Sequence, residues 1–130
     1  MSDYTVTGAL AQAAEKLAYP FHVGVVQCKD SFYGQHEPSR MPVGYELENK
    51  WRAWIMAGCL ASEMESSALF ILSSVLRCRA GAVFAVVWNQ ERERLGLVNP
   101  TVHSNERSIS TAIEALRILI KKDKEETSRG

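Results

Sequence analysis

Hydrophobic and polar residues form alternating blocks along the chain, and most blocks have the spacing of a helix or the length of a short strand. In four blocks the hydrophobic residues recur every three or four positions, which predicts amphipathic helices. These predicted helices span 6–17, 45–57, 62–76 and 104–120. Three shorter apolar runs predict strands. The predicted strands span 21–26, 59–61 and 82–87. Gly58 follows the second helical block, at the position where glycine commonly ends a helix.

The stretches between these blocks are polar. Residues 28–42 contain Gly34, Pro38 and Pro42 and predict a long loop or lid. Residues 89–99 predict a charged loop, and residues 121–130 predict a flexible, solvated tail.

Alternation of strands and helices predicts an α/β fold, with a mainly parallel or mixed sheet flanked by helices. The chain has 130 residues and a mass of 14.5 kDa. A chain of this size buries about two-thirds of its extended surface, which is enough for one core. We therefore expect one domain, or part of one, over residues 1–130.

Composition and motifs exclude several classes of protein. The 15 basic and 15 acidic residues balance, which argues against nucleic-acid or membrane-surface binding. The longest apolar run is far shorter than the ~20 residues that span a bilayer. Three widely spaced cysteines indicate reduced thiols in the cytosol rather than a disulfide or zinc framework. The chain has no glycine-rich phosphate loop and no histidine pair with metal-ligand spacing.

Each predicted strand runs directly into polar sequence. In parallel sheets, ligands bind outside the carboxyl ends of the strands. We therefore expect three polar clusters to converge on one crevice. They lie in 30–40, 63–65 and 89–90.

Glu63, Met64 and Glu65 form the acidic cluster. An ionised carboxylate only accepts hydrogen bonds, so it suits the two neighbouring hydroxyls of a ribose. The alternative is structural, because Ser62 and Glu65 have the spacing of a capping box, in which the glutamate bonds its own helix backbone. The sequence leaves both interpretations open.

The other two clusters contain amides. Gln35 can donate and accept at once, which matches a pyrimidine edge, while Phe32 can pack on a base or sugar and Arg40 can donate to a carbonyl oxygen. Asn89 and Gln90 stand at the end of the last predicted strand. At such a position they either contact a ligand or form a turn. Two other groups favour structural roles. His36 is expected on a loop surface, and Trp51 and Trp54 in the core.

Four segments in this order resemble the C-terminal half of the uridine phosphorylases, a family within the nucleoside phosphorylase superfamily. The residues that carry the resemblance are 22–25, 30–38, 61–66 and 87–91. The Phe-Tyr-Gly-Gln and Glu-Met-Glu-Ser elements are specific in combination, and the likeness extends from about 4 to 120. It implies the fold of that superfamily and the reversible phosphorolysis of uridine to uracil and ribose 1-phosphate, a step of pyrimidine salvage.

The resemblance also implies roles for the site residues. Glu65 holds the ribose hydroxyls, Met64 lies against the sugar, and Glu63 supports the site. Gln35 reads the uracil edge, Phe32 packs beside the base, and Arg40 donates to a uracil oxygen. We assign no catalytic residue and expect no metal. Arg40 lies five residues after Gln35, whereas one branch of the family has this arginine two residues after the glutamine.

Asn89 and Gln90 also differ from related branches of the family. One branch has arginine at the Gln90 position. Purine-specific relatives carry an aspartate near these positions, and its absence here favours a pyrimidine substrate.

The family's phosphate-binding glycine loop and arginines belong to an N-terminal half that has no counterpart in this sequence. We therefore expect a fragment or shortened product that binds uridine, or uracil and ribose, and needs the missing half for phosphate. The resemblance further implies phosphate as co-substrate, no cofactor, a homo-oligomer and a cytoplasmic location. Alternatives are a non-catalytic remnant, an interaction module, or a related nucleosidase.

Overall fold

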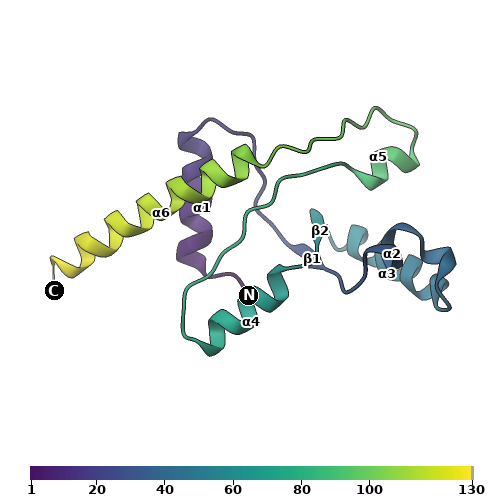
Figure 1. The fold of residues 1–130 in the computed structure, drawn as a ribbon, viewed down its shortest axis with the longest axis horizontal. Helices are drawn as coiled ribbons and strands as arrows, with labels where there is room; N and C mark the ends of the chain where they lie inside the picture. Colours follow the sequence, from purple (N-terminus) through teal and green to yellow (C-terminus); the bar gives the residue numbers. More distant parts are fainter. Residues whose placement is uncertain (130) are drawn as a thin grey trace. The chain divides into compact units, whose positions relative to one another are not determined.

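The computed structural model describes residues 1–129, which form two compact units. The sheet unit comprises His22–Cys78 together with Met1, and the helix-pair unit comprises Ser2–Phe21 and the chain from Arg79 onward. Figure 1 follows the chain through its elements, which are α/β in type, as predicted. In chain order they are α1 (Tyr4–Lys16), β1 (Val26–Cys28), α2 (Phe32–His36), η1 (Pro38–Arg40), α3 (Gly44–Met56), β2 (Ala61–Glu63), α4 (Ser66–Val75), α5 (Gln90–Arg94) and α6 (Glu106–Thr127).

Helices α1 and α6 pack against each other through small residues. Asp3 begins α1, because its Oδ1 accepts a hydrogen bond from the backbone N–H of Val6 at 3.0 Å. The core of the helix pair consists of Ala9, Ala13, Ala115 and Leu119, all of which are buried. Alanine side chains let two helix backbones approach closely, and the partly buried side chains of Val6, Leu10 and Ile118 pack against this core.

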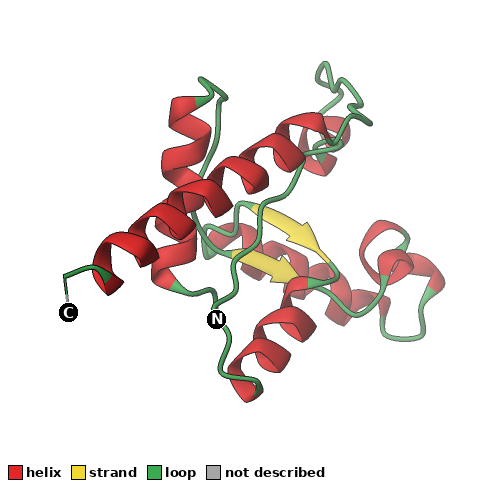
Figure 2. Ribbon diagram, turned by 60° about the vertical axis from the view of Figure 1, so that its left-hand side comes forward, coloured by secondary structure: helices red, strands yellow, loops and turns green. Residues whose placement is uncertain are grey.

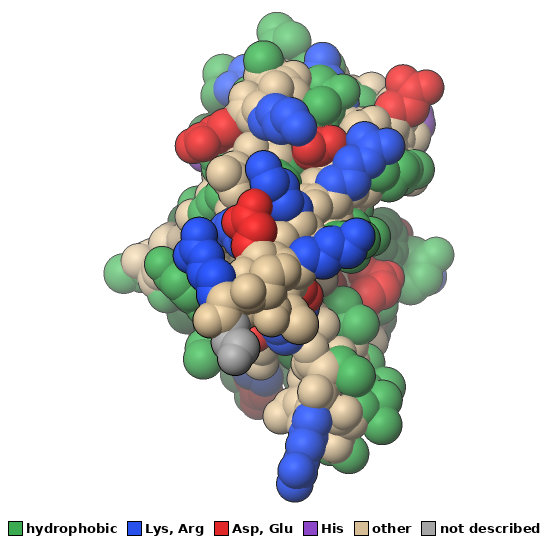
Figure 3. Space-filling view, turned by 90° about the vertical axis from the view of Figure 1, so that its left-hand side faces the viewer, with side chains coloured by type: hydrophobic (Ala, Val, Ile, Leu, Met, Phe, Trp, Pro, Cys, Tyr) green, Lys and Arg blue, Asp and Glu red, His purple; other side chains and the backbone are tan. Residues whose placement is uncertain are grey.

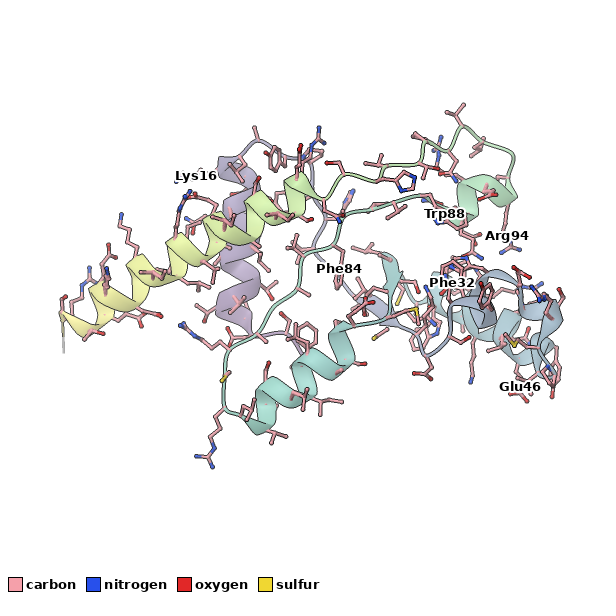
Figure 4. All side chains as sticks on the ribbon, in the orientation of Figure 1. Lys16, Phe32, Glu46, Phe84, Trp88 and Arg94 are labelled. Carbon is pink, nitrogen blue, oxygen red and sulfur yellow. The ribbon has the colours of Figure 1, made fainter. Side chains whose placement is uncertain are left out.

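A buried carboxylate joins the two helices. Glu114 of α6 accepts a hydrogen bond from Lys16 Nζ at 2.5 Å and another from Arg117 at 3.2 Å. Figure 4 labels Lys16 at the end of α1, beside α6. The hydrogen bond from Lys16, followed by that from Arg117, lowers the pKa of Glu114 below its ordinary value.

The strand predicted over 82–87 is absent from the described residues, which run without regular secondary structure from 78 to 89. A strand needs a hydrogen-bonded neighbour. The Val87 carbonyl accepts a hydrogen bond from the Val102 N–H at 2.8 Å, and the Ala80 carbonyl accepts one from the Asp3 N–H at 2.8 Å, but these isolated bonds do not make a ladder. After this segment, the charged loop predicted over 89–99 contains α5.

In the sheet unit, β1 and β2 form a two-stranded parallel sheet, which confirms the predicted parallel pairing. Figure 2 shows the two strands side by side and pointing the same way. Val26 lies opposite Ala61 and Cys28 opposite Glu63. Both strands begin later than the apolar runs over 21–26 and 59–61 that predicted them.

The predicted lid over 28–42 is partly helical, so that prediction was wrong in detail. Ser31 begins α2 by accepting a hydrogen bond from the Gly34 N–H at 3.1 Å. Pro38 then stands first in η1, where its missing N–H costs no helical hydrogen bond.

The two longer helices of the sheet unit are exposed on most of their surface. Gly58, with φ of 77°, follows α3 in the left-handed region, as predicted. Trp51 is half-buried and Trp54 is 42% exposed, so the expectation that both lie in the core was wrong within this structure. Helix α4 begins at Ser66 rather than at 62 and buries only that serine.

The C-terminal stretch expected as a flexible tail over 121–130 is helical as far as Thr127.

Figure 3 shows basic side chains on one face of the molecule, with acidic and hydrophobic ones among them. Within residues 1–129, none of the helices has the length and apolar character needed to cross a membrane.

Candidate functional site

The carboxyl ends of β1 and β2 lie next to each other, and the residues that follow them form the candidate site. Parallel pairing of Cys28 with Glu63 places the segments after both strands at one edge of the sheet. The Lys29 N–H continues this pairing by donating to the Glu63 carbonyl at 2.9 Å. Two of the three predicted polar clusters, 30–40 and 63–65, therefore meet within the sheet unit.

Gln35 belongs to the same group of contacts. The hydroxyl of Ser62, in β2, donates to Gln35 Oε1 at 2.7 Å. This hydrogen bond joins α2 to the end of β2, across 27 positions of the sequence. Gln35 therefore lies beside the strand that leads into Glu63, Met64 and Glu65.

The two glutamates of the acidic cluster have different surroundings. Glu63 caps α4: its Oε2 accepts from the backbone N–H groups of Glu65 and Ser66 at 2.8 Å, and its Oε1 from the Ser66 hydroxyl at 2.6 Å. Burial alone would raise the pKa of Glu63, but the hydrogen bonds from Ser66 and Glu65 outweigh burial and lower it.

Glu65 is exposed, and its Oε2 accepts from the Met64 backbone N–H at 3.1 Å. The capping box that the sequence left open for Ser62 and Glu65 is not formed, because Ser62 lies in β2 and Glu63 accepts from the N–H groups at the start of α4. Met64 is also exposed, at 40%. Of the two glutamates, Glu65 is therefore the carboxylate available to a ligand.

Lys29 lies at the centre of this region. Its Nζ donates to Ser62 Oγ at 3.2 Å and lies 5.8 Å from the centre of the Phe32 ring. Burial lowers the pKa of Lys29, while the carboxylates of Glu63 and Glu65 act in the opposite direction. The ammonium thus lies over an aromatic ring and donates to a hydroxyl.

Aromatic rings cover one side of α2. Phe32 stacks in a tilted arrangement on His36, with ring centres 4.1 Å apart, and meets Tyr33 edge to face at 5.5 Å. His36 is half-buried in a helix, so the expectation of a histidine on a loop surface was wrong. Phe32 itself is 49% exposed and offers an apolar surface beside Gln35.

Arg40, the third residue predicted to contact a base, lies at the end of η1 and is exposed. It forms an ion pair with Glu37 three residues earlier, and the hydrogen bond from this pair raises the pKa of Arg40. Its contact with a base stays a prediction.

Asn89 and Gln90 belong to the helix-pair unit, so their convergence with the other two clusters also stays a prediction. The Asn89 side chain caps α5 by accepting from the Arg92 N–H at 2.9 Å, and the Asn99 amide bonds the Asn89 backbone. These contacts favour the turn-forming interpretation of Asn89.

A hollow of about 650 Å³ lies nearby in the same unit. Its lining includes Val87, Trp88, Asn99 and His103.

Sequence reasoning overlooked Lys29 and considered Ser62 only as part of a possible capping box. A usable signal was present, because both lie at the carboxyl ends of the two short apolar runs, where the sheet was expected to place ligand contacts. Within residues 1–129, no cluster of three or more histidine, cysteine or carboxylate side chains has the arrangement of a metal site.

Residues 1–121 match the family model described as Phosphorylase superfamily. The chain belongs to this superfamily. A uridine phosphorylase from Treponema pallidum (strain Nichols) is 54% identical over 121 residues, which is 93% of this chain and 47% of the relative. A uridine phosphorylase from Thermococcus kodakarensis is 32% identical over the whole chain and 46% of its own length. The Escherichia coli (strain K12) uridine phosphorylase is 27% identical over 123 residues, covering 92% of this chain and 49% of the relative.

The chain spans about half the length of these curated phosphorylase superfamily relatives. The match covers both described units, including the β1 and β2 ends and the residues after them.

Proposed function

We propose that this chain carries the nucleoside-binding part of a uridine phosphorylase, a pentosyltransferase of pyrimidine salvage. The observation that carries the proposal is the 54% identity to the Treponema pallidum uridine phosphorylase over 93% of the chain. The local geometry supports it, because Gln35 and the segment bearing Glu65 lie at one edge of the sheet, joined through Ser62.

On this proposal, Glu65 accepts hydrogen bonds from the ribose hydroxyls, since its carboxylate is exposed and does not cap the helix. Met64 covers the sugar. Glu63 acts indirectly, by holding the start of α4 and so the backbone of Glu65. The sugar side of the site thus depends on a fixed turn between β2 and α4.

The base side is formed by Phe32 and Gln35, with Arg40 as a further donor. Cleavage of the glycosidic bond gives the sugar oxocarbenium character and leaves negative charge on the departing uracil. Donors placed before the reaction stabilise that charge at little reorganisation cost. Arg40 fills this role only after it turns from Glu37 towards the base.

We further propose that phosphate is the co-substrate and binds to polypeptide outside this sequence, that no cofactor is needed, and that the active form is a cytoplasmic homo-oligomer. The partial span of the chain supports the first point, because about half of each relative has no counterpart here.

The test has two steps. Titration calorimetry measures uridine and uracil binding to the 130-residue chain, and we expect binding at millimolar ligand or below. The chain is then mixed with a polypeptide matching the part of the Treponema pallidum relative that it does not cover, and uracil release is measured with and without phosphate. We expect ribose 1-phosphate only in the mixture and only with phosphate. Absence of nucleoside binding would overturn the proposal, and release with water alone would indicate a nucleosidase.

A further inference from the structure

A chain of hydrogen bonds runs from Lys29 through Ser62 to Gln35. Lys29 Nζ donates to Ser62 Oγ at 3.2 Å, and Ser62 Oγ donates to Gln35 Oε1 at 2.7 Å. All three side chains are half-buried. Lys29 directly follows β1, while Ser62 is the central residue of β2, so the paired strands hold the first two groups in place.

The direction of this chain follows from donor and acceptor chemistry. A lysine ammonium has three donors and no acceptor, so the Ser62 oxygen must accept from it. The one proton of the hydroxyl then points to another acceptor, and Gln35 Oε1 is that acceptor. If the Gln35 amide were turned over, its N–H₂ would face the hydroxyl and the hydroxyl proton would lose this partner.

We propose that Lys29 is a positioning residue, which acts through Ser62 to fix the orientation of the Gln35 amide and thereby the choice between uracil and cytosine. The choice of base rests on the proposed function; the fixed orientation does not. A cation that polarises a hydroxyl strengthens the next hydrogen bond in the chain, which makes the orientation firmer.

The two bases differ at the edge that an amide reads. Uracil offers a carbonyl oxygen beside an N–H donor, so it pairs with an amide that donates and accepts in matching order. Cytosine has an acceptor nitrogen where uracil has that N–H, and its exocyclic group donates. When the Gln35 amide is fixed in the orientation that suits uracil, its oxygen faces the lone pair of the acceptor nitrogen in cytosine, and the two repel. An amide that is free to turn can pair with either base.

Four single variants of the 130-residue chain test this inference. Lys29→Met and Ser62→Ala break the chain of hydrogen bonds, while Lys29→Arg and Ser62→Thr retain a cation and a hydroxyl. Calorimetry gives the ratio of uracil to cytosine affinity for each. We expect the two breaking variants to lower this ratio by about tenfold, equivalent to about 1.4 kcal/mol. The two conservative variants should change the ratio less than the breaking variants do, because they retain a cationic donor at position 29 and a hydroxyl at position 62.

The double variant Lys29→Met with Ser62→Ala tests whether the two residues act through one chain of hydrogen bonds, which we call the relay, or independently of each other. Residues that act through one another are non-additive, so the double variant should lower the ratio no further than either single variant. Additive losses, or an unchanged ratio in either breaking variant, would overturn the inference. A purely structural role would weaken both bases alike and leave the ratio unchanged.

A second measurement needs no ligand. In ¹⁵N NMR spectra, the side-chain amide resonances of Gln35 should shift in Lys29→Met and in Ser62→Ala, with the helix-pair unit unchanged as the control for folding. If neither nucleobase binds but these resonances shift, the proposed function fails and the fixed orientation stands. If they do not shift, the relay is wrong whatever binds.

Discussion

Glu63 and Glu65 stand two positions apart, and the structure predicts opposite consequences for replacing them. Glu63→Ala removes the acceptor for two backbone N–H groups and for the buried Ser66 hydroxyl. Glu65→Ala removes an exposed carboxylate that accepts a hydrogen bond from the Met64 N–H. One substitution damages a helix, and the other damages the proposed sugar site.

The expected magnitudes separate clearly. Loss of a helix cap typically costs about 1 kcal/mol, and a buried hydroxyl left without its acceptor adds about 1 kcal/mol or more. We therefore expect Glu63→Ala to destabilise the start of α4 by about 2 kcal/mol. Glu65→Ala should cost at most about 0.5 kcal/mol of stability, as exposed substitutions do.

For ligand binding the order is reversed. Hydrogen bonds to a charged group contribute about 1.5–3 kcal/mol, so Glu65→Ala should weaken uridine binding by about ten- to a hundredfold. Uracil has no ribose, so its affinity for the same variant should stay within about twofold. Uracil therefore serves as the internal control for an intact base site.

Amide hydrogen exchange over Ser66–Val75 measures the stability of α4, and calorimetry measures the two affinities. The reasoning is refuted if Glu65→Ala opens α4 as much as Glu63→Ala does while uridine affinity is retained. That result would mean that Glu65 is the structural carboxylate and would remove the support for a sugar site here.

Three further predictions concern stability. Leu119→Ala should destabilise the helix-pair unit by about 3 kcal/mol, because it leaves a cavity at a buried position between α1 and α6. Urea unfolding measures this loss, and a value below about 1 kcal/mol would mean that Leu119 is not packed in the core. Gly81→Ala should cost about 1–3 kcal/mol in the same assay, since its added Cβ would lie 2.5 Å from Val6 Cγ1. Gly8→Ala is the control, because its added Cβ would meet no atom within 4 Å beyond its chain neighbours and its own helix backbone. The stabilisation of α4 by Glu63 should be fully present above the ordinary glutamate pKa of 4.5. It should be lost as the pH falls through the lowered pKa of Glu63 in the folded state, because the unfolded state binds the proton first. Hydrogen exchange over α4 measures this pH dependence, which Glu63→Gln should lack.

Local signals in the sequence located the long helices but not their ends, because α1 begins at Tyr4 rather than at 6 and α6 continues to Thr127 through the predicted tail. Both α1 and α6 carry a clear helical stripe, and Asp3 marks the start of α1 with its own side chain. The predicted limits of the strands were less accurate, because the residues that belong to a strand are decided by its hydrogen bonds to a neighbouring strand. The apolar run over 21–26 contributes only Val26 to β1, since the register with Ala61 decides which residues pair. The equally apolar run over 82–87 forms no strand in the described chain.

The candidate site shows the same limit. The order of strand and polar cluster correctly indicated that Gln35 and the acidic segment would lie near each other. Which glutamate caps α4 depended on where the helix begins, and that boundary is set by the end of β2 rather than by the Ser62–Glu65 spacing. The position of Lys29 after a predicted strand was a usable signal, but its hydrogen bond to Ser62 could not be predicted locally, because the two residues are 33 positions apart.

The helix pair has a consequence for synthesis on the ribosome. Lys16 and Glu114, which join α1 to α6, are separated by 98 positions, whereas His22–Cys78 is one uninterrupted segment. At about 5–20 residues per second, α1 waits roughly 5–20 s before its partner emerges. During that interval the alanine stripe of α1 faces solvent or a chaperone. The unit that is completed later therefore contains α1, which leaves the ribosome before the sheet unit does.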